Sequence, residues 1–390
     1  MTVTNKPNLA GLSLANLKAL FVDAGEKPFR AEQVMKWIHQ RGMLDLDVMT
    51  DISKTLREKL KQTTVIGVPK VLQDYKSADG CRKWIIEVAS GSCVEMVFIP
   101  EAGRGTLCIS SQAGCSLDCS FCATGKQGFN SNLSVAEIVG QLWWAKRKLG
   151  EFDGSMERVV SNVVMMGMGE PLLNFVNVME AVNIMMEDCA YGLSKRKVTI
   201  STSGVVPAID RLKDFTDASL AISLHAPNDD LRSRIMPINK KYPISELLRS
   251  VQAYMDSLSD KRVPVIEYTM IKGVNDHRAH ARELATLLSE FPCKINLIPF
   301  NPFSLSDYER PSGSSVTNFR QILQAAGYTV TVRTTRGEDI GAACGQLVGE
   351  VDDLTRRSSR HKRITDDRKR DAKIFDHADN LAVAADRVVR

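Results

Sequence analysis

The stretch Cys115-Ser116-Leu117-Asp118-Cys119-Ser120-Phe121-Cys122 places three cysteines at a spacing of C-x3-C-x2-C. Thiolates are soft ligands that select iron–sulfur clusters, zinc or Cu(I). A structural zinc site usually has four protein ligands, but the nearest upstream cysteine is Cys108 and the first histidine downstream is His225. Three thiolates on a [4Fe–4S] cluster leave one iron free to bind a small molecule. The alternatives at this point are a zinc clip or three unrelated buried cysteines.

The composition is that of an ordinary globular protein. Of its 390 residues, 44% are hydrophobic and 25% are charged, which are common proportions. The sequence has no run of about 18 apolar residues, and its N-terminus lacks the basic start and apolar core of a secretion signal. Nine cysteines in this length are not disulfide-dense, and thiolates that hold a cluster must stay reduced. We therefore expect a cytoplasmic protein, most simply a monomer, with no membrane partner.

The N-terminal region, residues 1–65, is predicted to be a helical accessory domain. Leu14, Leu17 and Leu20 repeat at helical spacing, and Pro28 and Gly42 interrupt the pattern. The region has many basic side chains, so we interpret it either as an RNA-contacting domain or as a packing appendage. These side chains are Lys18, Lys27, Arg30, Lys36, Arg41, Arg57, Lys59 and Lys61.

The next two regions change from antiparallel strands to alternating strands and helices. Residues 66–104 have strand periodicity interrupted by the turn signals Asp79-Gly80 and Ser90-Gly91, which predicts an antiparallel β extension of about three strands. Residues 105–349 repeat a strand, a loop and a helix, which predicts an α/β domain with a parallel sheet, open or barrel-like. The expected strands are 106–111, 158–166, 197–203, 218–224, 264–271 and 294–298.

Basic residues gather in short runs and in the C-terminal region. Residues 350–390 combine arginines and lysines with aspartates and show little hydrophobic periodicity, which predicts a basic, disordered tail. Several basic runs on one surface would neutralise phosphates, although such runs are usually solvated. The runs are Lys146-Arg147-Lys148, Lys195-Arg196-Lys197, Arg232-Ser233-Arg234 and Lys240-Lys241.

Polar residues follow several of the predicted parallel strands. In barrel folds the chemistry lies at the C-terminal ends of the strands, and the cysteine loop follows the first of them. Gly167-Met168-Gly169-Glu170 follows the second strand, where glycines let the backbone approach a ligand. Ser201, Ser223 with His225, and Asn301 follow later strands. His225 considered alone would be interpreted as a structural histidine.

The cysteine spacing, with an aromatic residue before the last cysteine, resembles the signature of radical S-adenosylmethionine (SAM) enzymes. Further motifs together resemble the RlmN/Cfr family of radical SAM RNA methyltransferases, from the N-terminal helices to Leu347. The resemblance implies a partial (β/α)6 radical SAM barrel with the helical domain and the β extension attached. The motifs are Glu95–Pro100, Cys108–Cys115, Gly167–Leu172, Ser201–Gly204, Ser223–Ala226 and Arg336–Leu347.

The resemblance also implies the cofactors and their sites. Cys115, Cys119 and Cys122 would hold a [4Fe–4S] cluster whose fourth iron chelates SAM. The remaining cofactor-binding residues would be Gly169, Glu170, Ser201, Ser223, Leu224, His225 and Asn301.

Two further cysteines and one carboxylate would complete the catalytic set. The C2 carbon of adenine is not nucleophilic, and the family therefore uses two SAM molecules per turnover. The first would methylate Cys344, and the second would supply a radical that activates this methyl group for addition to the base. Cys108 would resolve the product through a transient disulfide, and Glu95 would be a proton acceptor. Without the resemblance, Cys108 and Cys344 would be interpreted as small buried hydrophobic residues.

The resemblance thus implies methylation of C2 of adenosine in 23S rRNA and in tRNA, next to the anticodon. An electron donor such as flavodoxin or ferredoxin would be a further partner. Two alternatives stay open: C8 methylation of the rRNA adenosine, and a noncatalytic RNA-binding protein with a zinc clip.

Overall fold

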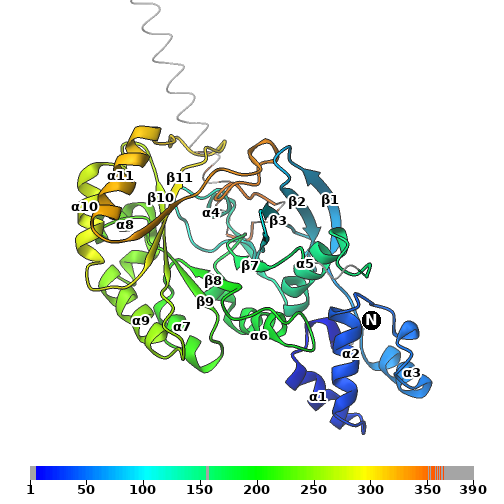
Figure 1. Cartoon of the computed structure of the whole chain (residues 1–390). Coiled ribbons are helices and arrows are strands. Elements are labelled where there is room, and N and C mark those ends of the chain that lie inside the picture. The colour runs from blue at the N-terminus through cyan, green and yellow to red at the C-terminus, as the bar shows by residue number, and fades with distance from the viewer. Residues whose placement is uncertain are drawn as a thin grey trace, which may run out of the picture.

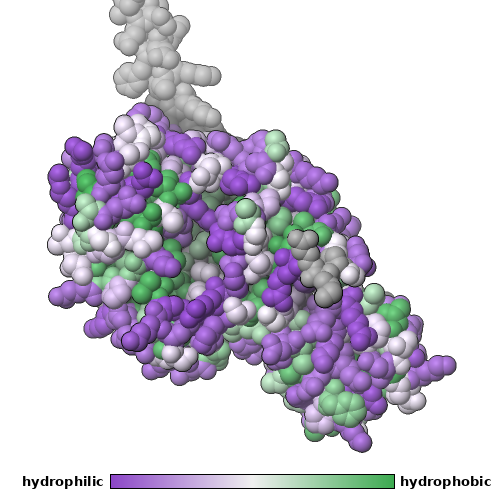
Figure 2. Space-filling view, in the orientation of Figure 1, coloured by the Kyte–Doolittle hydropathy of each residue, from purple (hydrophilic) through white to green (hydrophobic). Residues whose placement is uncertain are grey.

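The computed structural model describes residues 6–154 and 158–349, together with 351, 353–355, 357, 359, 361 and 363. Three parts follow one another along the chain: an N-terminal helical unit, an antiparallel extension and a barrel-like parallel sheet covered by helices (Figure 1). The N-terminal unit projects away from the barrel in Figure 1. Figure 2 shows mainly hydrophilic side chains on this face, with hydrophobic ones in scattered patches.

The N-terminal unit consists of α1 (Leu14–Asp23), α2 (Phe29–His39) and α3 (Lys54–Thr63). Ser13 and Ser53 cap α1 and α3, because each side chain accepts a hydrogen bond from a first-turn amide. Leu17 and Phe21 on α1, Val34 and Ile38 on α2, and Leu56 and Leu60 on α3 are buried in the core. The Trp143 indole on the barrel donates to the Ile38 carbonyl at 3.0 Å, which joins this unit to the rest of the molecule.

The sheet is continuous across ten strands in the order β1-β2-β3-β4-β7-β8-β9-β10-β11-β12. The antiparallel extension comprises β1 (Lys70–Lys76), β2 (Arg82–Glu87) and β3 (Cys93–Glu101). Strand β3 also pairs antiparallel with β4 (Arg104–Cys108), the first strand of the parallel part. The extension is therefore an edge of the barrel sheet itself.

The parallel part confirms the predicted α/β fold class and open barrel. Each neighbouring pair from β4 to β12 is parallel. The last strand, β12, was not predicted, because four residues with one buried side chain give too short a pattern. After β4 the strands are β7 (Asn162–Met165), β8 (Val198–Thr202), β9 (Ser219–Ser223), β10 (Val265–Met270), β11 (Lys294–Pro299) and β12 (Thr329–Val332).

Helices cover the outside of the parallel strands (Figure 1). In the first of them, Ser134 and Glu137 form a capping box, which satisfies two orphan amides at the helix start. The helices are α5 (Val135–Lys148), α6 (Phe175–Met186), α7 (Val206–Ile209), α8 (Asp229–Ile235), α9 (Ile244–Asp256), α10 (Arg278–Leu287) and α11 (Gly313–Ala325). Among the described residues, none of the helices is both long and apolar enough to cross a bilayer.

The segment after β12, residues 333–349, returns across the open side of the barrel to the antiparallel extension. Arg336 forms an ion pair with Asp79 in the β1–β2 turn, with Nε and Oδ2 2.8 Å apart. In the same turn, the Ser77 hydroxyl donates to Asp339 at 2.6 Å. The two ends of the sheet are therefore linked by polar contacts.

The predicted tail, residues 350–390, is only partly described. We call its described residues (351, 353–355, 357, 359, 361 and 363) the C-terminal segment. This segment contacts the cysteine loop, where Arg357 donates hydrogen bonds to backbone carbonyls. The prediction of disorder does not describe these residues. Residues 364–390 lie outside the described residues.

Candidate functional site

The cysteine loop lies at the mouth of the barrel, between two short elements. A small hairpin of β5 (Gln112–Gly114) and β6 (Phe129–Asn132) flanks it, together with α4 (Ala123–Gln127). The amide of Cys115 donates to the Gly128 carbonyl at 2.6 Å, which fixes the start of the loop. A Cβ on Gly114 would collide with that same carbonyl, and its φ of 76° also requires glycine.

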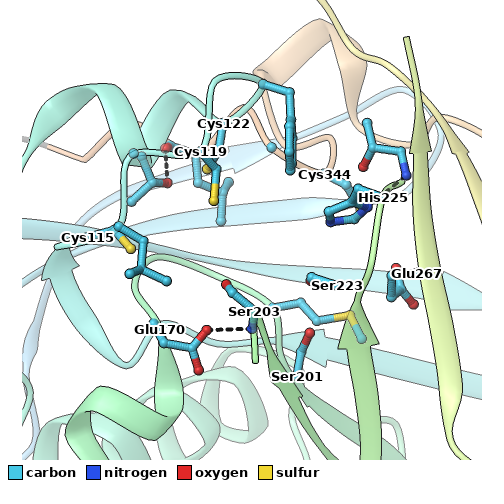
Figure 3. Close-up of a pocket in the computed structure, with 18 of the residues that line it drawn as sticks. Cys115, Cys119, Cys122, Glu170, Ser201, Ser203, Ser223, His225, Glu267 and Cys344 are labelled. Carbon is cyan, nitrogen blue, oxygen red and sulfur yellow. Dashed lines mark hydrogen bonds between the residues drawn. The ribbon is translucent and has the colours of Figure 1, made fainter. Parts of the chain in front are cut away.

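The three thiols of this loop line a pocket that continues to the ends of the parallel strands (Figure 3). Burial is the main cause that raises the pKa of Cys115 to about 12, and the neighbouring Cys122 thiolate adds to it. Burial followed by Cys122 and Cys115 likewise raises the pKa of Cys119. Two buried thiols and a half-buried one, whose negative charges would repel one another, need a bound cation to become thiolates.

These thiols fit a cluster better than a single ion. Among the described residues, no group of three His, Cys, Asp or Glu side chains converges on one point as a mononuclear metal requires. In a [4Fe–4S] cluster each thiolate binds a different iron, so the three sulfurs do not need to converge. The donor set is soft and contains only thiols, which also suits iron–sulfur chemistry.

The glycine-rich turn after β7 forms the next wall of the pocket. Gly169 has a φ of 96°, and a Cβ there would lie 2.5 Å from the Gln112 side chain, so only glycine fits. Glu170 is 2% exposed, and burial raises its pKa. Its carboxylate accepts hydrogen bonds from the amide of Ser203 at 2.7 Å (Figure 3) and from the amide of Leu172 at 3.0 Å. This carboxylate is therefore held at the pocket by one backbone donor just after β8 and by one in the turn that follows Glu170 itself.

Four other predicted residues reach the same pocket from the ends of later strands: Ser201, Ser223, His225 and Asn301. His225 has a φ of 58°, a strained backbone for a residue with a side chain. Its Nδ1 accepts a hydrogen bond from the Thr269 amide at 2.8 Å, which fixes the ring. Burial lowers the pKa of His225 to about 3, so the ring is neutral. The ring also packs edge-on against Phe121, 4.7 Å between centroids.

Leu224, the remaining predicted cofactor residue, does not line the pocket. It is fully buried, and its carbonyl accepts a hydrogen bond from Arg232 at 3.1 Å. Arg232 also donates to the carbonyls of Ser203 and Ser223, at 2.7 and 3.0 Å, and to Asn239 at 2.8 Å. The Arg232 side chain is 0% exposed, so its assignment to a basic surface run was wrong. Instead, Arg232 ties together the ends of β8 and β9.

Cys344 lies between two cavities. It lines the pocket of the cysteine loop, and it also lines a second cavity of about 500 Å³, whose other lining residues include Thr106, Thr199 and Val265 on the parallel strands. The thiol is on an exposed residue, and the Asn301 side chain holds its carbonyl at 3.1 Å. Arg333 lines the second cavity, and the Cys344 thiolate, with Glu267 as a smaller contributor, raises the pKa of Arg333. A cation thus lies beside this thiol.

Cys108 and Glu95 lie behind the pocket wall and do not line it. Cys108 ends β4 and is half-buried; burial first, and the nearby Cys344 second, raise its pKa to about 12. Glu95 on β3 is 2% exposed and forms an ion pair with Lys83 at 3.2 Å. Burial raises the pKa of Glu95, whereas Lys83 lowers it.

The Lys83–Glu95 pair also holds both ends of the loop that carries Cys344. The Lys83 ammonium donates to the Gly341 carbonyl at 3.4 Å. The Glu95 carboxylate accepts from the Val348 amide at 3.3 Å. The position of Cys344 is therefore coupled to a buried ion pair on the antiparallel extension.

Sequence reasoning did not select four residues that shape the site: Ser203, Glu267, Arg232 and Arg333. Glu267 is a carboxylate inside the apolar strand β10, and that contrast was a usable signal for a buried functional group. The two arginines resemble ordinary basic residues in the sequence, and only long-range contacts reveal their burial. Ser203 contributes its backbone amide, and because almost every residue type has such an amide, the sequence cannot show which one binds Glu170.

The comparisons with known proteins agree with this geometry. Residues 7–66 match the family profile "Ribosomal RNA large subunit methyltransferase N-terminal domain", and residues 109–285 match "Radical SAM superfamily". A crystal structure of a radical SAM methyltransferase from Sphaerobacter thermophilus superposes with a TM-score of 0.80 at 41% identity, covering 87% of this chain and 99% of that chain.

Curated relatives match over nearly the whole chain. The dual-specificity RNA methyltransferase RlmN of Marinobacter nauticus is 60% identical over 356 residues, which are 91% of this chain and 96% of that protein. The protein of the same name from Pseudomonas fluorescens is 60% identical over 92% of this chain and 94% of its own length. Radical SAM membership implies a [4Fe–4S] cluster and SAM as the cofactors. The chain therefore belongs to the RlmN family of radical SAM RNA methyltransferases.

Proposed function

We propose that this enzyme methylates C2 of adenosine in 23S rRNA and in tRNA, and that Cys344 carries the methyl group. The observation that carries the proposal is the place of Cys344: an exposed cysteine between the thiol-lined pocket and a second cavity, with Arg333 beside it. The dual specificity in the names of the relatives supports both RNA substrates. Cys115, Cys119 and Cys122 would hold the cluster.

SAM bound beside the cluster would supply the methyl group and, from a second molecule, the radical that activates it. The protein's own residues would position these reactants. The Glu170 carboxylate is held at the pocket by two amides and can accept from the SAM ammonium group. Ser201, Ser223 and Asn301 offer hydrogen bonds to its remaining polar groups. The neutral ring of His225 packs on Phe121 and shapes the wall beside the third cysteine.

Cys344 is suited to move between the two reactants. The Arg333 guanidinium lies beside its sulfur, and the thiolate is the form of a cysteine that would take the methyl group as a nucleophile. Glycines at 341 and 345, both with positive φ, flank this part of the loop and permit a change of its backbone. The adenine would enter the second cavity. There the carbon of the methyl group on Cys344 would form the bond to C2 of the base and so link the two.

Cys108 and Glu95 would release the product. After C2 of the adduct has lost its proton to Glu95 or a group near it, the Cys108 thiol would lose its own proton as its sulfur attacks the Cys344 sulfur. The attack would form the Cys108–Cys344 disulfide and break the Cys344 S–C bond, whose electron pair goes to the methylene carbon, and that carbon takes up a proton to become the methyl group. The unpaired electron of the adduct would leave to an electron carrier of the flavodoxin or ferredoxin class. The two cysteines interact electrostatically across β4, which supports this pairing. An electron donor of the flavodoxin or ferredoxin class would reduce the cluster.

Anaerobic reconstitution with SAM and RNA, followed by mass analysis of the nucleosides, tests the reaction. We expect 2-methyladenosine; 8-methyladenosine would show that the C8 alternative is correct. A Cys344→Ala variant should lose methylation and keep the absorbance of the cluster, and a Cys108→Ala variant should stall with RNA covalently attached. A colourless protein containing zinc in place of about four irons would refute the radical chemistry.

A further inference from the structure

The C-terminal segment contacts the cysteine loop through one side chain with four acceptors. Arg357 Nη1 donates to the carbonyls of Cys115 at 3.1 Å, Leu117 at 3.0 Å and Gly125 at 3.2 Å, and Nη2 donates to Ser116 at 2.7 Å. Three of these carbonyls belong to consecutive residues that begin with a proposed cluster ligand. The guanidinium therefore binds the backbone of the loop at four carbonyl groups at once.

The chain between Cys344 and Arg357 also runs along this loop. The Ala123 amide donates to the Gly345 carbonyl at 2.9 Å, and the Thr124 hydroxyl donates to the Leu347 carbonyl at 2.7 Å. Farther on, the Leu354 amide donates to the Phe129 carbonyl at 3.1 Å. The segment that presents the methyl-carrying cysteine thus continues directly into the one that holds the cluster loop.

Further side chains of the C-terminal segment contact the cysteine loop and the glycine that binds its first amide. Asp118, within the cysteine loop, lies 3.2 Å from His361 and 3.6 Å from Lys126. The Asp353 side chain occupies the space that a Cβ on Gly128 would take. Gly128 accepts the hydrogen bond from the Cys115 amide. The C-terminal segment therefore contacts the loop at Asp118 through His361, and it contacts Gly128, which binds the Cys115 amide, through Asp353.

We propose that Arg357 is a positioning residue for the iron–sulfur cluster, which rests on the cluster assignment of the proposed function. Four carbonyl oxygens at one point carry partial negative charges, and a single guanidinium with several fixed donors satisfies them together. The loop then keeps the geometry that presents three thiolates. The same positive charge stabilises the extra negative charge of the reduced cluster, so it raises the reduction potential.

The test compares Arg357→Gln, Arg357→Lys and Arg363→Gln in the full-length protein after anaerobic reconstitution. Arg363 is an exposed residue of the same segment, so its variant removes an equal charge without touching the loop. The readouts are iron release into a chelator, the reduction potential of the loaded cluster and its electron paramagnetic resonance signal with and without SAM. The thermal midpoint of each cluster-free protein checks folding.

We expect Arg357→Gln to release iron about tenfold faster, as is typical when an outer partner of a metal ligand is lost. Its potential should be more negative, because a nearby positive charge has been removed. Arg357→Lys should keep the wild-type potential but release iron faster, since an ammonium cannot match the planar guanidinium with four carbonyls. Arg363→Gln should match the wild type in all three readouts.

Two results would overturn the proposal. One is an Arg357→Gln protein with the wild-type rate of iron release, and the other is one whose loaded cluster titrates at the wild-type potential. If Arg357→Gln does not fold, Arg357→Lys decides, and wild-type iron release in that variant would also refute the role. A wild-type protein that binds no iron would instead reject the proposed function itself.

Discussion

Replacing Arg232 with methionine should destabilise the protein and loosen its SAM site together. Its guanidinium is fully buried and donates to three carbonyls at the ends of β8 and β9 and to Asn239. Burial lowers the pKa of Arg232 to about 10, so it remains a cation at neutral pH. Methionine would fill much of the volume but satisfy none of these acceptors.

The size of the effect follows from the four hydrogen bonds. Each bond to a charged donor contributes about 1.5–3 kcal/mol, and each buried acceptor left without a partner costs about 1–3 kcal/mol. Methionine also removes the cost of burying a charge, which offsets part of this loss. We therefore expect a net decrease of about 3–5 kcal/mol in the free energy of unfolding. Because Ser203 and Ser223 are among the acceptors, SAM should bind at least about tenfold more weakly, a change that needs only about 1.4 kcal/mol.

Urea denaturation of the cluster-free protein, followed by tryptophan fluorescence, measures the first quantity. Equilibrium binding of SAM to the reconstituted protein measures the second. Arg249→Met is the matched control, because Arg249 is exposed on α9 and the same atoms are exchanged. An Arg232→Met protein within about 1 kcal/mol of the wild type, with unchanged SAM binding, would show that this arginine does not organise the strand ends.

Three other predictions concern charge and backbone. Lys83→Met should raise the pKa of Glu95, because the ammonium group that lowers this pKa is removed while burial continues to raise it. The acidic limb of kcat/KM should shift to higher pH, and an unshifted pH profile would contradict this. Burial lowers the pKa of His39 to about 3. Between pH 6.5 and 3, His39 is therefore protonated in the unfolded chain but neutral in the folded protein. Over this range the free energy of unfolding should fall by up to about 4–5 kcal/mol, and urea denaturation of His39→Gln should show a smaller fall. Gly169→Ala should weaken SAM binding more than tenfold in a titration, because a Cβ would meet Gln112 at a positive φ.

The sequence was sufficient for six of the seven parallel strands and for most of the pocket, because both depend on local patterns. Short apolar runs that end in glycine or polar residues marked β7, β8 and β9, and the spacing of the cysteines marked the loop. Glu170 was found in the same way, since it follows a strand within a glycine-rich turn. All of these signals lie within about ten residues of the feature they predict.

What could not be predicted depends on contacts between distant residues. Arg232 belongs to a basic triplet in the sequence, and only its four partners show that it is internal. Similarly, Arg357 lies 242 positions from Cys115, whose carbonyl it binds. The strand β12 was missed because its pattern is short and mostly exposed. Buried polar side chains are thus the hardest to find, since their partners are set by the completed fold.

The link between Arg336 and Asp79 has a consequence for the order of events during biosynthesis. These residues are 257 positions apart, and every strand of the parallel part lies between them in the sequence. The loop with Cys344 is among the last parts of the described chain to leave the ribosome. A chain that stops before residue 336 therefore has the cysteine loop but lacks both this ion pair and the loop with Cys344. The loop with Cys344 is thus anchored to the antiparallel extension only once the whole of the described barrel has been synthesised.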